Sequence, residues 1–415
     1  MTLTFVALFL AQVVTSVRVL TRPNRETTSR IAWVAFVFAF PLIGIGAYFL
    51  LGETSIGRRR FARKTAALRK LQNIVEQAGP VSQPGLEELP ERFRAVFQFA
   101  QTVTLLPVTG GNTAELLSDS EAVTNAMIAD IDEATDHVHL LFYIWLTDTT
   151  GLRVVEALKR AARRGVTCRA IADDLGSRAL IKSDAWREME VAGVHLARAL
   201  KVDNPVFHFF DGRLDLRNHR KIVVVDNRVT YCGSQNCADA SFSPKPKFAP
   251  WVDLMMRFEG AVVEQNQLLF ASDWMTYSDE DIGPVLGARI PHPKEGFPAQ
   301  VIATGPTGRH SAMPDVFCSL IYAAMKELTI TTPYFAPNEA ILTALRTAGN
   351  RGVRCTLVLP ARNDNFLVAH AGRSHYASLL EAGVRIMEYP IGLLHAKSLV
   401  IDGQLTLIGS ANMDR

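Results

Sequence analysis

The feature that most constrains this chain is a pattern of eighteen residues that occurs twice. It reads HRKIVVVDNRVTYCGSQN from His219 and HAKSLVIDGQLTLIGSAN from His395. In both copies Lys follows the His by two positions, Asp by seven, and Gly, Ser and Asn by fourteen, fifteen and seventeen. Upstream segments repeat as well, because RRGVTCRAIADD from Arg163 resembles NRGVRCTLVLPA from Asn350. The chain is therefore expected to fold as two similar units, each near the size of a domain.

Both copies lie among apolar segments that alternate with helical ones. Short apolar runs at 137–146, 166–172 and 355–360 indicate strands buried on both faces, and 152–165 is typical of a helix. Buried strands separated by helices are typical of layered α/β folds. The sequence predicts an α/β fold with two α/β/α sandwich repeats related by a pseudo-twofold axis.

Four parts are expected along the 415 residues. Residues 1–55 are predicted to form a two-span transmembrane hairpin. Residues 56–104 form a basic juxtamembrane segment and a linker, of which 77–91 is rich in Pro, Gly, Gln and Glu. Residues 105–290 form the first repeat and residues 291–415 form the second.

Two apolar stretches predict the transmembrane hairpin. Residues Ile31–Leu51 run for twenty-one positions without a charge, which as a helix is enough to cross about 30 Å of hydrocarbon. Pro41 is compatible with this span because membrane helices accommodate proline. Met1–Val17 is shorter and predicts a second span, with a cleaved signal peptide as the alternative.

Basic residues predict the side of the membrane on which the repeats lie. Two spans leave both chain ends on one side, and the flank after the second span is more basic than the connecting loop. The protein is therefore predicted to be a multi-pass cell-membrane protein with a cytoplasmic catalytic part. Five cysteines without a CxxC pair indicate reduced, buried thiols, which suits that compartment. The loop carries Arg18, Arg22, Arg25 and Arg30, and the flank carries Arg58, Arg59, Arg60, Arg63, Lys64, Arg69 and Lys70.

The repeated pattern also predicts an anion site. Because side chains alternate along a strand, His219 and Lys221 share one face, and so do His395 and Lys397. Two imidazoles, two ammonium groups and the donors of the Gly-Ser-x-Asn segments suit a tetrahedral phosphate. One His can attack phosphorus while the other transfers protons, and no metal or other cofactor is expected. The candidate phosphate ligands are Ser234, Asn236, Ser410 and Asn412.

Asp226 and Asp402 complete the pattern and are counted with the candidate catalytic residues. They lie an odd number of positions from their His, so we expect them on the opposite face or in the following turn. Their expected contribution is to shape the strand end rather than to touch the substrate.

These residues match the signature His-x-Lys-x4-Asp of the phospholipase D superfamily, and the whole chain resembles the bacterial cardiolipin synthases. The resemblance implies two phospholipase D-type repeats that condense two phosphatidylglycerol molecules to cardiolipin and glycerol. It further implies a phosphohistidine on His219, with His395 as acid and then base. The likeness extends to GRRR at 57–60, PVTGGN at 107–112, YIW at 143–145, RNHRK at 217–221 and TPYFAPN at 332–338.

The resemblance also implies a carboxylate that orients each catalytic imidazole, and Asp253 is expected to serve His219. The counterpart for His395 is expected beyond Arg415, because relatives continue further, so the second repeat is predicted to be truncated at its C-terminus. A chain ending there would have a poorly oriented acid and an exposed sheet edge.

Three functions remain open from the sequence. The leading one, the phosphatidyltransferase, has the bilayer and anionic phosphatidylglycerol as its partners. The same site would act as a phospholipase D hydrolase with water as acceptor; nucleic acid is not expected, because the net charge is only +3 and no basic and aromatic stripe is present. A non-catalytic membrane scaffold is the third, and the oligomeric state stays open.

Overall fold

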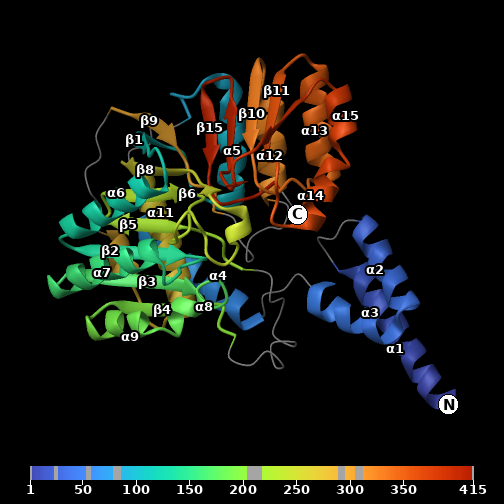
Figure 1. Cartoon of the computed structure of the whole chain (residues 1–415), viewed down its shortest axis with the longest axis horizontal. Helices are drawn as coiled ribbons and strands as arrows, with labels where there is room; N and C mark the ends of the chain where they lie inside the picture. Colours follow the sequence, from blue (N-terminus) through green and yellow to red (C-terminus); the bar gives the residue numbers. More distant parts are fainter. Residues whose placement is uncertain are drawn as a thin grey trace.

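The computed structural model describes residues 2–22, 27–52, 58–77, 86–202, 217–287, 295–303 and 312–413. Two repeats, each built on its own sheet, lie beside a group of N-terminal helices (Figure 1). Arg25 and most of the predicted linker, at 78–85, lie outside the described residues.

The N-terminal helices differ from the predicted hairpin. Among the described helices, α1 (Thr2–Thr21) is the one that is long and apolar enough to cross a membrane, over Thr4–Thr21. The continuous helix predicted over Ile31–Leu51 is wrong, because the chain leaves helical geometry at Phe40, with φ −133° and ψ 76°. The next residue is Pro41, which lacks an N–H and disfavours helical backbone in the residue before it. The segment therefore consists of α2 (Thr27–Ala39), α3 (Pro41–Ala47) and a π-helical turn, η1 (Tyr48–Gly52).

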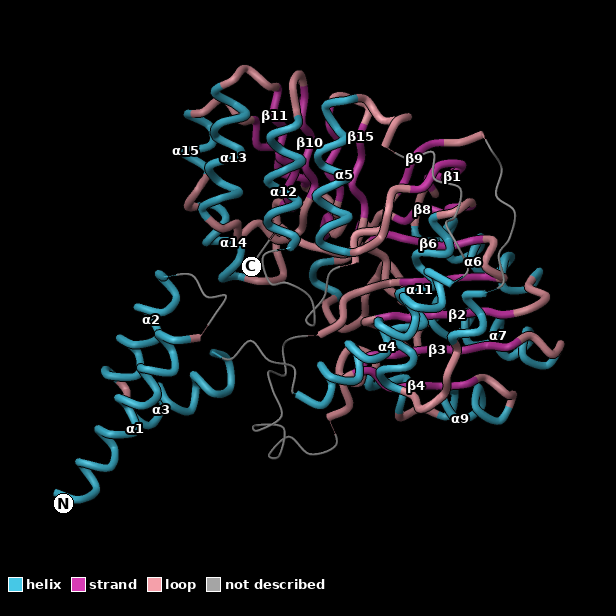
Figure 2. Tube along the Cα trace, turned by 180° about the vertical axis from the view of Figure 1, so that it is seen from behind, coloured by secondary structure: helices cyan, strands magenta, loops and turns pink. Residues whose placement is uncertain are grey.

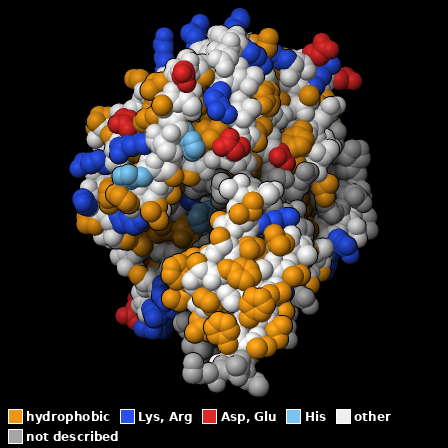
Figure 3. Space-filling view, turned by 90° about the vertical axis from the view of Figure 1, so that its right-hand side faces the viewer, with side chains coloured by type: hydrophobic (Ala, Val, Ile, Leu, Met, Phe, Trp, Pro, Cys, Tyr) orange, Lys and Arg blue, Asp and Glu red, His pale blue; other side chains and the backbone are white. Residues whose placement is uncertain are grey.

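Helices α2 and α3 pack closely at this break. A Cβ added to Gly44 would lie 2.7 Å from the backbone oxygen of Phe36, so only glycine permits the approach. The rings of Trp33 and Tyr48 meet edge to face at 5.6 Å. Apolar side chains cover the outside of these helices (Figure 3). Among the exposed ones are Phe5 (76% exposed) and Leu42 (75% exposed). Such a surface suits a lipid environment.

The first repeat is built on an eight-stranded sheet of order β4-β3-β2-β5-β6-β8-β1-β9. Its strands alternate between two cores, so that Val223 and Val225 face one helical layer while Ile222 and Val224 face the other. The expected α/β/α layering is thus confirmed. The strands are β1 (Thr109–Leu116), β2 (His137–Phe142), β3 (Thr167–Asp173), β4 (His195–Ala199), β5 (Ile222–Val225), β6 (Val229–Gly233), β8 (Met255–Glu259) and β9 (Phe297–Ala299).

Helices cover both faces of this sheet. One layer holds α6 (Ser120–Glu133), α7 (Thr149–Arg163), α8 (Arg178–Ile181) and α9 (Asp184–Val191). The other holds α11 (Val262–Tyr277) and α4 (Arg58–Gln77), the helix that follows the N-terminal group, with the 3-10 turn η3 (Gly283–Gly287) beside it. Leu71 of α4 is fully buried in that second core, so the juxtamembrane helix is an integral part of the first repeat.

The second repeat has the same strand order with fewer elements. Its sheet runs β12-β11-β10-β14-β15, which corresponds strand for strand to β4-β3-β2-β5-β6. The described helices cover only one face of this sheet. The other face is more exposed, at Thr329, Val358 and Val400. Figure 2 shows helices α5, α12, α13 and α15 aligned along one side of these strands. The strands are β10 (Glu327–Thr331), β11 (Arg354–Pro360), β12 (Arg385–Tyr389), β14 (Ser398–Ile401) and β15 (Leu405–Ile408), and the helices are α5 (Glu91–Thr104), α12 (Ala312–Ala323), α13 (Glu339–Asn350), α14 (Phe366–Arg373) and α15 (Tyr376–Glu381).

Short strands join the repeats. Strand β13 (Leu393–Leu394) pairs in parallel with β7 (Trp251–Val252), which follows the 3-10 turn η2 (Pro246–Phe248) of the first repeat. This pairing ends directly before His395 and Asp253, so it brings the second copy of the pattern onto the first repeat. Of the five cysteines, Cys168, Cys237 and Cys355 are buried, as expected, whereas Cys232 and Cys318 are partly exposed.

Candidate active site

The two His–Lys pairs occupy equivalent positions at the start of β5 and β14. Lys221 and Lys397 are each 5% exposed. The Nζ of Lys221 donates to the backbone oxygen of His219 at 2.8 Å, and that of Lys397 donates to the oxygen of His395 at 2.5 Å. A buried ammonium favours a bound anion.

The pairs from the two repeats act on one another electrostatically. Burial, followed by the positive charges of Lys221 and Lys397, lowers the pKa of His219. Burial also lowers the pKa of Lys221 to about 8, and the charge of Asp253 opposes that shift. Because groups from both repeats perturb each other, the predicted convergence of the two copies at one place is present in the structure.

His395 is held by the first repeat. Its Nδ1 lies 2.6 Å from Oδ1 of Asp253, and its ring packs on Trp251 with the ring centroids 4.5 Å apart. Its backbone N–H donates to the oxygen of Val252 at 2.8 Å. The sequence predicts Asp253 as the partner of His219 and leaves His395 poorly oriented; the structure instead places Asp253 against His395.

The electrostatics of this pair follow from its burial. Burial lowers the pKa of His395; the carboxylate of Asp253 opposes the shift and the charge of Lys397 adds to it. Burial favours the neutral acid of Asp253, but the neighbouring His395 and Lys397 lower its pKa overall. The carboxylate is therefore ionised at neutral pH and fixes the tautomer of His395 with a proton on Nδ1, which leaves Nε2 free.

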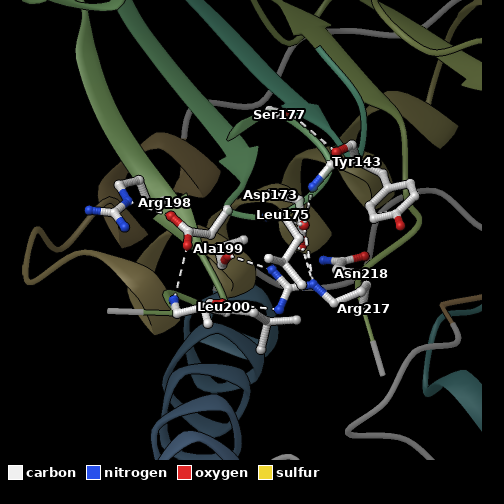
Figure 4. A network of polar contacts seen from close by, with 12 residues as sticks. Tyr143, Asp173, Leu175, Ser177, Arg198, Ala199, Leu200, Arg217 and Asn218 are labelled. Carbon is white, nitrogen blue, oxygen red and sulfur yellow. Dashed lines mark hydrogen bonds and ion pairs between the residues drawn. The ribbon is translucent and has the colours of Figure 1, made fainter. Parts of the chain in front are cut away.

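His219 is held in a different way. Its ring stacks on Tyr143 with the centroids 4.2 Å apart, and no hydrogen bond to the ring is present within the described residues. Arg217 fixes the start of this segment, because its guanidinium forms an ion pair with Asp173 at 2.8 Å and donates to the oxygen of Leu200 at 3.1 Å (Figure 4). The imidazole thus depends on its chain neighbours for its position.

Asp226 and Asp402 lie at the far ends of β5 and β14, away from the two histidines. Asp226 accepts hydrogen bonds from the backbone N–H groups of Thr135, Asp136 and His137, between 2.8 and 2.9 Å. Asp402 does the same for the loop before β10. Both aspartates thus lie in the turn at the strand end, where they hold the loops before β2 and β10, and we propose that this is their contribution.

The four candidate phosphate ligands differ in their surroundings. The hydroxyl of Ser234 is buried and donates to Asp253 at 2.6 Å, so this side chain holds Asp253 in place. Asn236 accepts from the backbone N–H of Ile144 at 3.3 Å through Oδ1, and its Nδ2 has no hydrogen-bond partner among the described residues. Ser410 and Asn412 follow β15 in the equivalent place, and Ser410 lines the cavity described next.

A cavity of about 880 Å³ extends from the two lysines between the sheets of the two repeats. Lys221, Lys397 and Ser410 lie at its polar part. Most of its lining is apolar, including Phe93, Phe97, Leu116, Met256, Phe258, Phe317, Val400, Leu405 and Leu407. A cavity of this character accommodates a ligand with a charged group and long apolar parts.

Several residues of the site were not found from the sequence. Tyr143 and Trp251 pack on the histidines, and Arg217 fixes the segment before His219. Tyr143 and Arg217 lie in the motifs YIW and RNHRK, whereas no motif marked Trp251. The run RNHRK does carry a signal, because charged residues on both sides of a buried His need partners of opposite charge.

The chain is similar in sequence to known protein families and to known proteins. A family model described as cardiolipin synthase, PLD-like domain, matches residues 127–249 and 317–415, and one described as phospholipase D-nuclease N-terminal matches residues 10–53. Cardiolipin synthase A of Proteus mirabilis (strain HI4320) is 35% identical over 395 residues, which cover 94% of this chain and 81% of that protein. The same enzyme of Yersinia pseudotuberculosis serotype O:1b (strain IP 31758) is 36% identical over the same shares. The solved phosphatidylserine synthase of Haemophilus influenzae Rd KW20 is 14% identical with a TM-score of 0.48, covering 74% of this chain and 80% of that one.

Proposed function

Since the chain belongs to the cardiolipin synthase family with phospholipase D-like domains, we propose that it condenses two phosphatidylglycerol molecules to cardiolipin and glycerol. The observation that carries this proposal is the meeting of two His–Lys pairs, one from each repeat, with Asp253 bonded to His395. Such an arrangement provides a nucleophile, a proton carrier and two cations for a phosphodiester.

In the first step His219 attacks the phosphorus of the donor lipid. Its lowered pKa keeps the imidazole neutral at neutral pH, so one ring nitrogen carries a free electron pair. Binding of the anionic phosphodiester favours the imidazolium form of His395, which then takes up a proton on Nε2. The new P–N bond forms as the bond between phosphorus and the glycerol oxygen breaks, and His395 gives that Nε2 proton to the glycerol oxygen. Lys221 and Lys397 balance the charge on the phosphate oxygens, together with the amides of Asn236 and Asn412 and the hydroxyl of Ser410.

In the second step the roles of the groups reverse. His395, now neutral, removes a proton from the terminal hydroxyl of a second phosphatidylglycerol, and that oxygen attacks the phosphohistidine. The P–N bond breaks, cardiolipin forms, and His219 returns to its starting state. Asp253 stabilises the protonated form of His395 that occurs in both steps.

The cavity and the N-terminal helices support a lipid as the substrate. The apolar lining next to Lys221 and Lys397 suits acyl chains whose phosphate lies at the lysines. Helix α1 is long enough to cross the bilayer, and it keeps the repeats at the membrane surface. A nucleic acid is charged along its backbone and has no long apolar chains to fill an apolar cavity of this size.

For the membrane topology we propose two crossings, with both repeats in the cytoplasm. The greater number of basic residues after Gly52 than between the two apolar stretches supports this orientation. The second crossing then uses α2 together with α3 and η1, because α2 alone is only about 20 Å long. Cysteines placed at Thr27 and at Ala66 should react with a membrane-impermeant reagent from opposite sides of sealed vesicles; labelling of both from one side contradicts this topology.

The test of the reaction uses the full-length protein in vesicles that contain phosphatidylglycerol labelled in its headgroup and acyl chains. Labelled cardiolipin with released glycerol supports transfer, whereas phosphatidic acid means that water is the acceptor. His219→Ala should abolish both product and covalent lipid adduct. His395→Ala should still form adduct from a lipid with an activated leaving group, because such a group needs no proton. Full activity of folded His219→Ala protein would remove the assignment.

A further inference from the structure

We propose that helix α4 positions the nucleophile: Lys64 of this helix holds Asp273, and Asp273 holds both chain neighbours of His219. This inference rests on the proposed function only in naming His219 as the nucleophile. It assigns a mechanical role in the active site to a helix that the sequence analysis treated as a juxtamembrane segment.

Asp273 on α11 is the centre of the arrangement. It is 1% exposed, and its Oδ2 accepts from the amide of Asn218 at 3.0 Å and from the guanidinium of Arg220 at 2.7 Å. Asn218 is also bonded to the backbone N–H of Arg220 at 3.2 Å. One carboxylate therefore fixes the residues immediately before and after His219, whose own ring is held only by stacking on Tyr143 among the described contacts.

Lys64 supplies the charge that allows Asp273 to be buried. Its Nζ donates to Oδ1 of Asp273 and, at 3.1 Å, to the hydroxyl of Ser272. Lys64 is itself 5% exposed, and burial lowers its pKa to about 8, although the charge of Asp273 opposes that shift. The ammonium is charged at neutral pH, so Lys64 and Arg220 together hold Asp273 as an anion. An ion pair buried to this degree has a defined geometry, because neither partner can exchange its contact for water.

The second repeat has no equivalent of this arrangement around His395 among the described residues. The residues that flank His395 are Leu394 and Ala396, which have no polar side chains. There the backbone N–H groups of His395 and Ala396 donate to the oxygen of Val252, and Asp253 fixes the ring. The two histidines are thus positioned by unrelated means, one through a strand pairing and the other through the helix next to the membrane anchor.

The experiment compares variants of α4 in the full-length protein. Lys64→Met removes the charge, Lys64→Gln keeps a donor, and Lys64→Arg keeps both. Lys70→Met is one control, because Lys70 lies on the same helix and pairs with Asp281 at 2.5 Å on the surface, away from His219. Leu71→Ala is the second control, because it weakens the packing of α4 without touching Asp273.

Two measurements separate positioning from simple stability. We expect Lys64→Met to lower kcat by between about 10-fold and about 100-fold, with KM within about twofold. Lys64→Gln should be intermediate, Lys64→Arg should recover much of the rate, and Lys70→Met should match the wild type. Hydrogen exchange at residues 217–221 should become faster in Lys64→Met and stay unchanged in Lys70→Met.

The outcomes distinguish this proposal from the function itself. If the wild type makes no cardiolipin but exchange at 217–221 is faster in Lys64→Met, the positioning role is supported and the proposed function is removed. Unchanged exchange and unchanged kcat in folded Lys64→Met protein overturn the positioning role. The positioning role is also overturned if Leu71→Ala loses as much kcat as Lys64→Met at an equal loss of melting temperature. The loss of kcat would then come from weaker packing of α4 in general.

Discussion

The carboxylate of Asp253 lies 2.6 Å from Nδ1 of His395, so a residue of the first repeat orients the imidazole of the second. Ser234 donates to the same carboxylate oxygen at 2.6 Å and thereby fixes its direction. The proton carrier of the proposed reaction is therefore assembled from both halves of the chain.

Replacement of Asp253 by Asn should impair proton transfer rather than nucleophilic attack. The amide is neutral and cannot stabilise a protonated His395, so turnover should fall by about 10²-fold or more. Formation of the covalent adduct from a lipid with an activated leaving group should change far less, because that step needs no proton. Rapid-quench measurement of adduct and of cardiolipin separates the two. A parallel loss in both would assign Asp253 to His219 after all.

Anion binding should be coupled to proton uptake. Burial and the neighbouring lysines lower the pKa of His219 and of His395, so both are neutral in the empty site at neutral pH. A bound dianion raises these pKa values, hence the complex holds more protons than the free protein. The affinity for sulfate should therefore increase as pH falls from about 7.5 to about 5.5. Calorimetry in two buffers of different ionisation enthalpy measures the uptake. A double His→Gln variant should lose most of it and keep only the part from Lys221, whose pKa is about 8; pH-independent binding by the wild type contradicts the prediction.

Asp402→Ala should reduce stability without altering the chemistry. The carboxylate accepts from the backbone N–H groups of Met325, Lys326 and Glu327, between 2.8 and 3.1 Å, and pairs with Arg92 at 2.6 Å. Loss of these acceptors should lower the free energy of unfolding by about 2–4 kcal/mol. These hydrogen bonds lower the pKa of Asp402, so its contribution is present at neutral pH and is lost as pH falls below about 4. Urea unfolding gives the stability, and a kcat that falls in fully folded variant would instead mark Asp402 as a participant in catalysis.

The duplicated pattern was sufficient to predict the convergence of the two His–Lys pairs, because two copies of one unit place equivalent side chains in equivalent positions. Strand alternation was not the reason, since both pairs precede β5 and β14. The odd spacing of Asp226 likewise predicted its place at the strand end. Spacing along the chain could not predict the partner of Asp253, since strand β13 from the other repeat brings His395 beside it. The same limit applies to Lys64, whose partner Asp273 lies 209 residues away.

The break in the second apolar stretch was missed for a different reason. Hydropathy records only that residues 31–51 are uncharged, whereas the end of α2 depends on the backbone of one residue, Phe40, before Pro41. Local sterics at a single proline outweighed the general tolerance of membrane helices for that residue.

Gly392→Ala should disturb the joint between the repeats. Gly392 has φ +60°, and an added Cβ would lie 1.9 Å from the backbone oxygen of Pro250, which accepts the N–H of Leu393 at 3.0 Å. Both melting temperature and cardiolipin formation should decrease, because β13 must move away from β7. Gly403→Ala is the matched control: its φ is +65°, but the nearest atom to its Cβ is 3.9 Å away. That variant should lose only about 1–2 kcal/mol of stability and keep its activity; equal losses of activity in both variants would contradict the argument.

The joint of β7 and β13 also determines when during synthesis the enzyme can become active. His395 lies 142 residues after Asp253, and at roughly 5–20 residues per second the ribosome needs roughly 7–30 seconds to pass from one to the other. During that interval the N-terminal helices and the proposed nucleophile, His219, have already been synthesised, but the proposed acid, His395, has not. The order of residues along the chain therefore delays the proposed reaction until the second repeat has been synthesised.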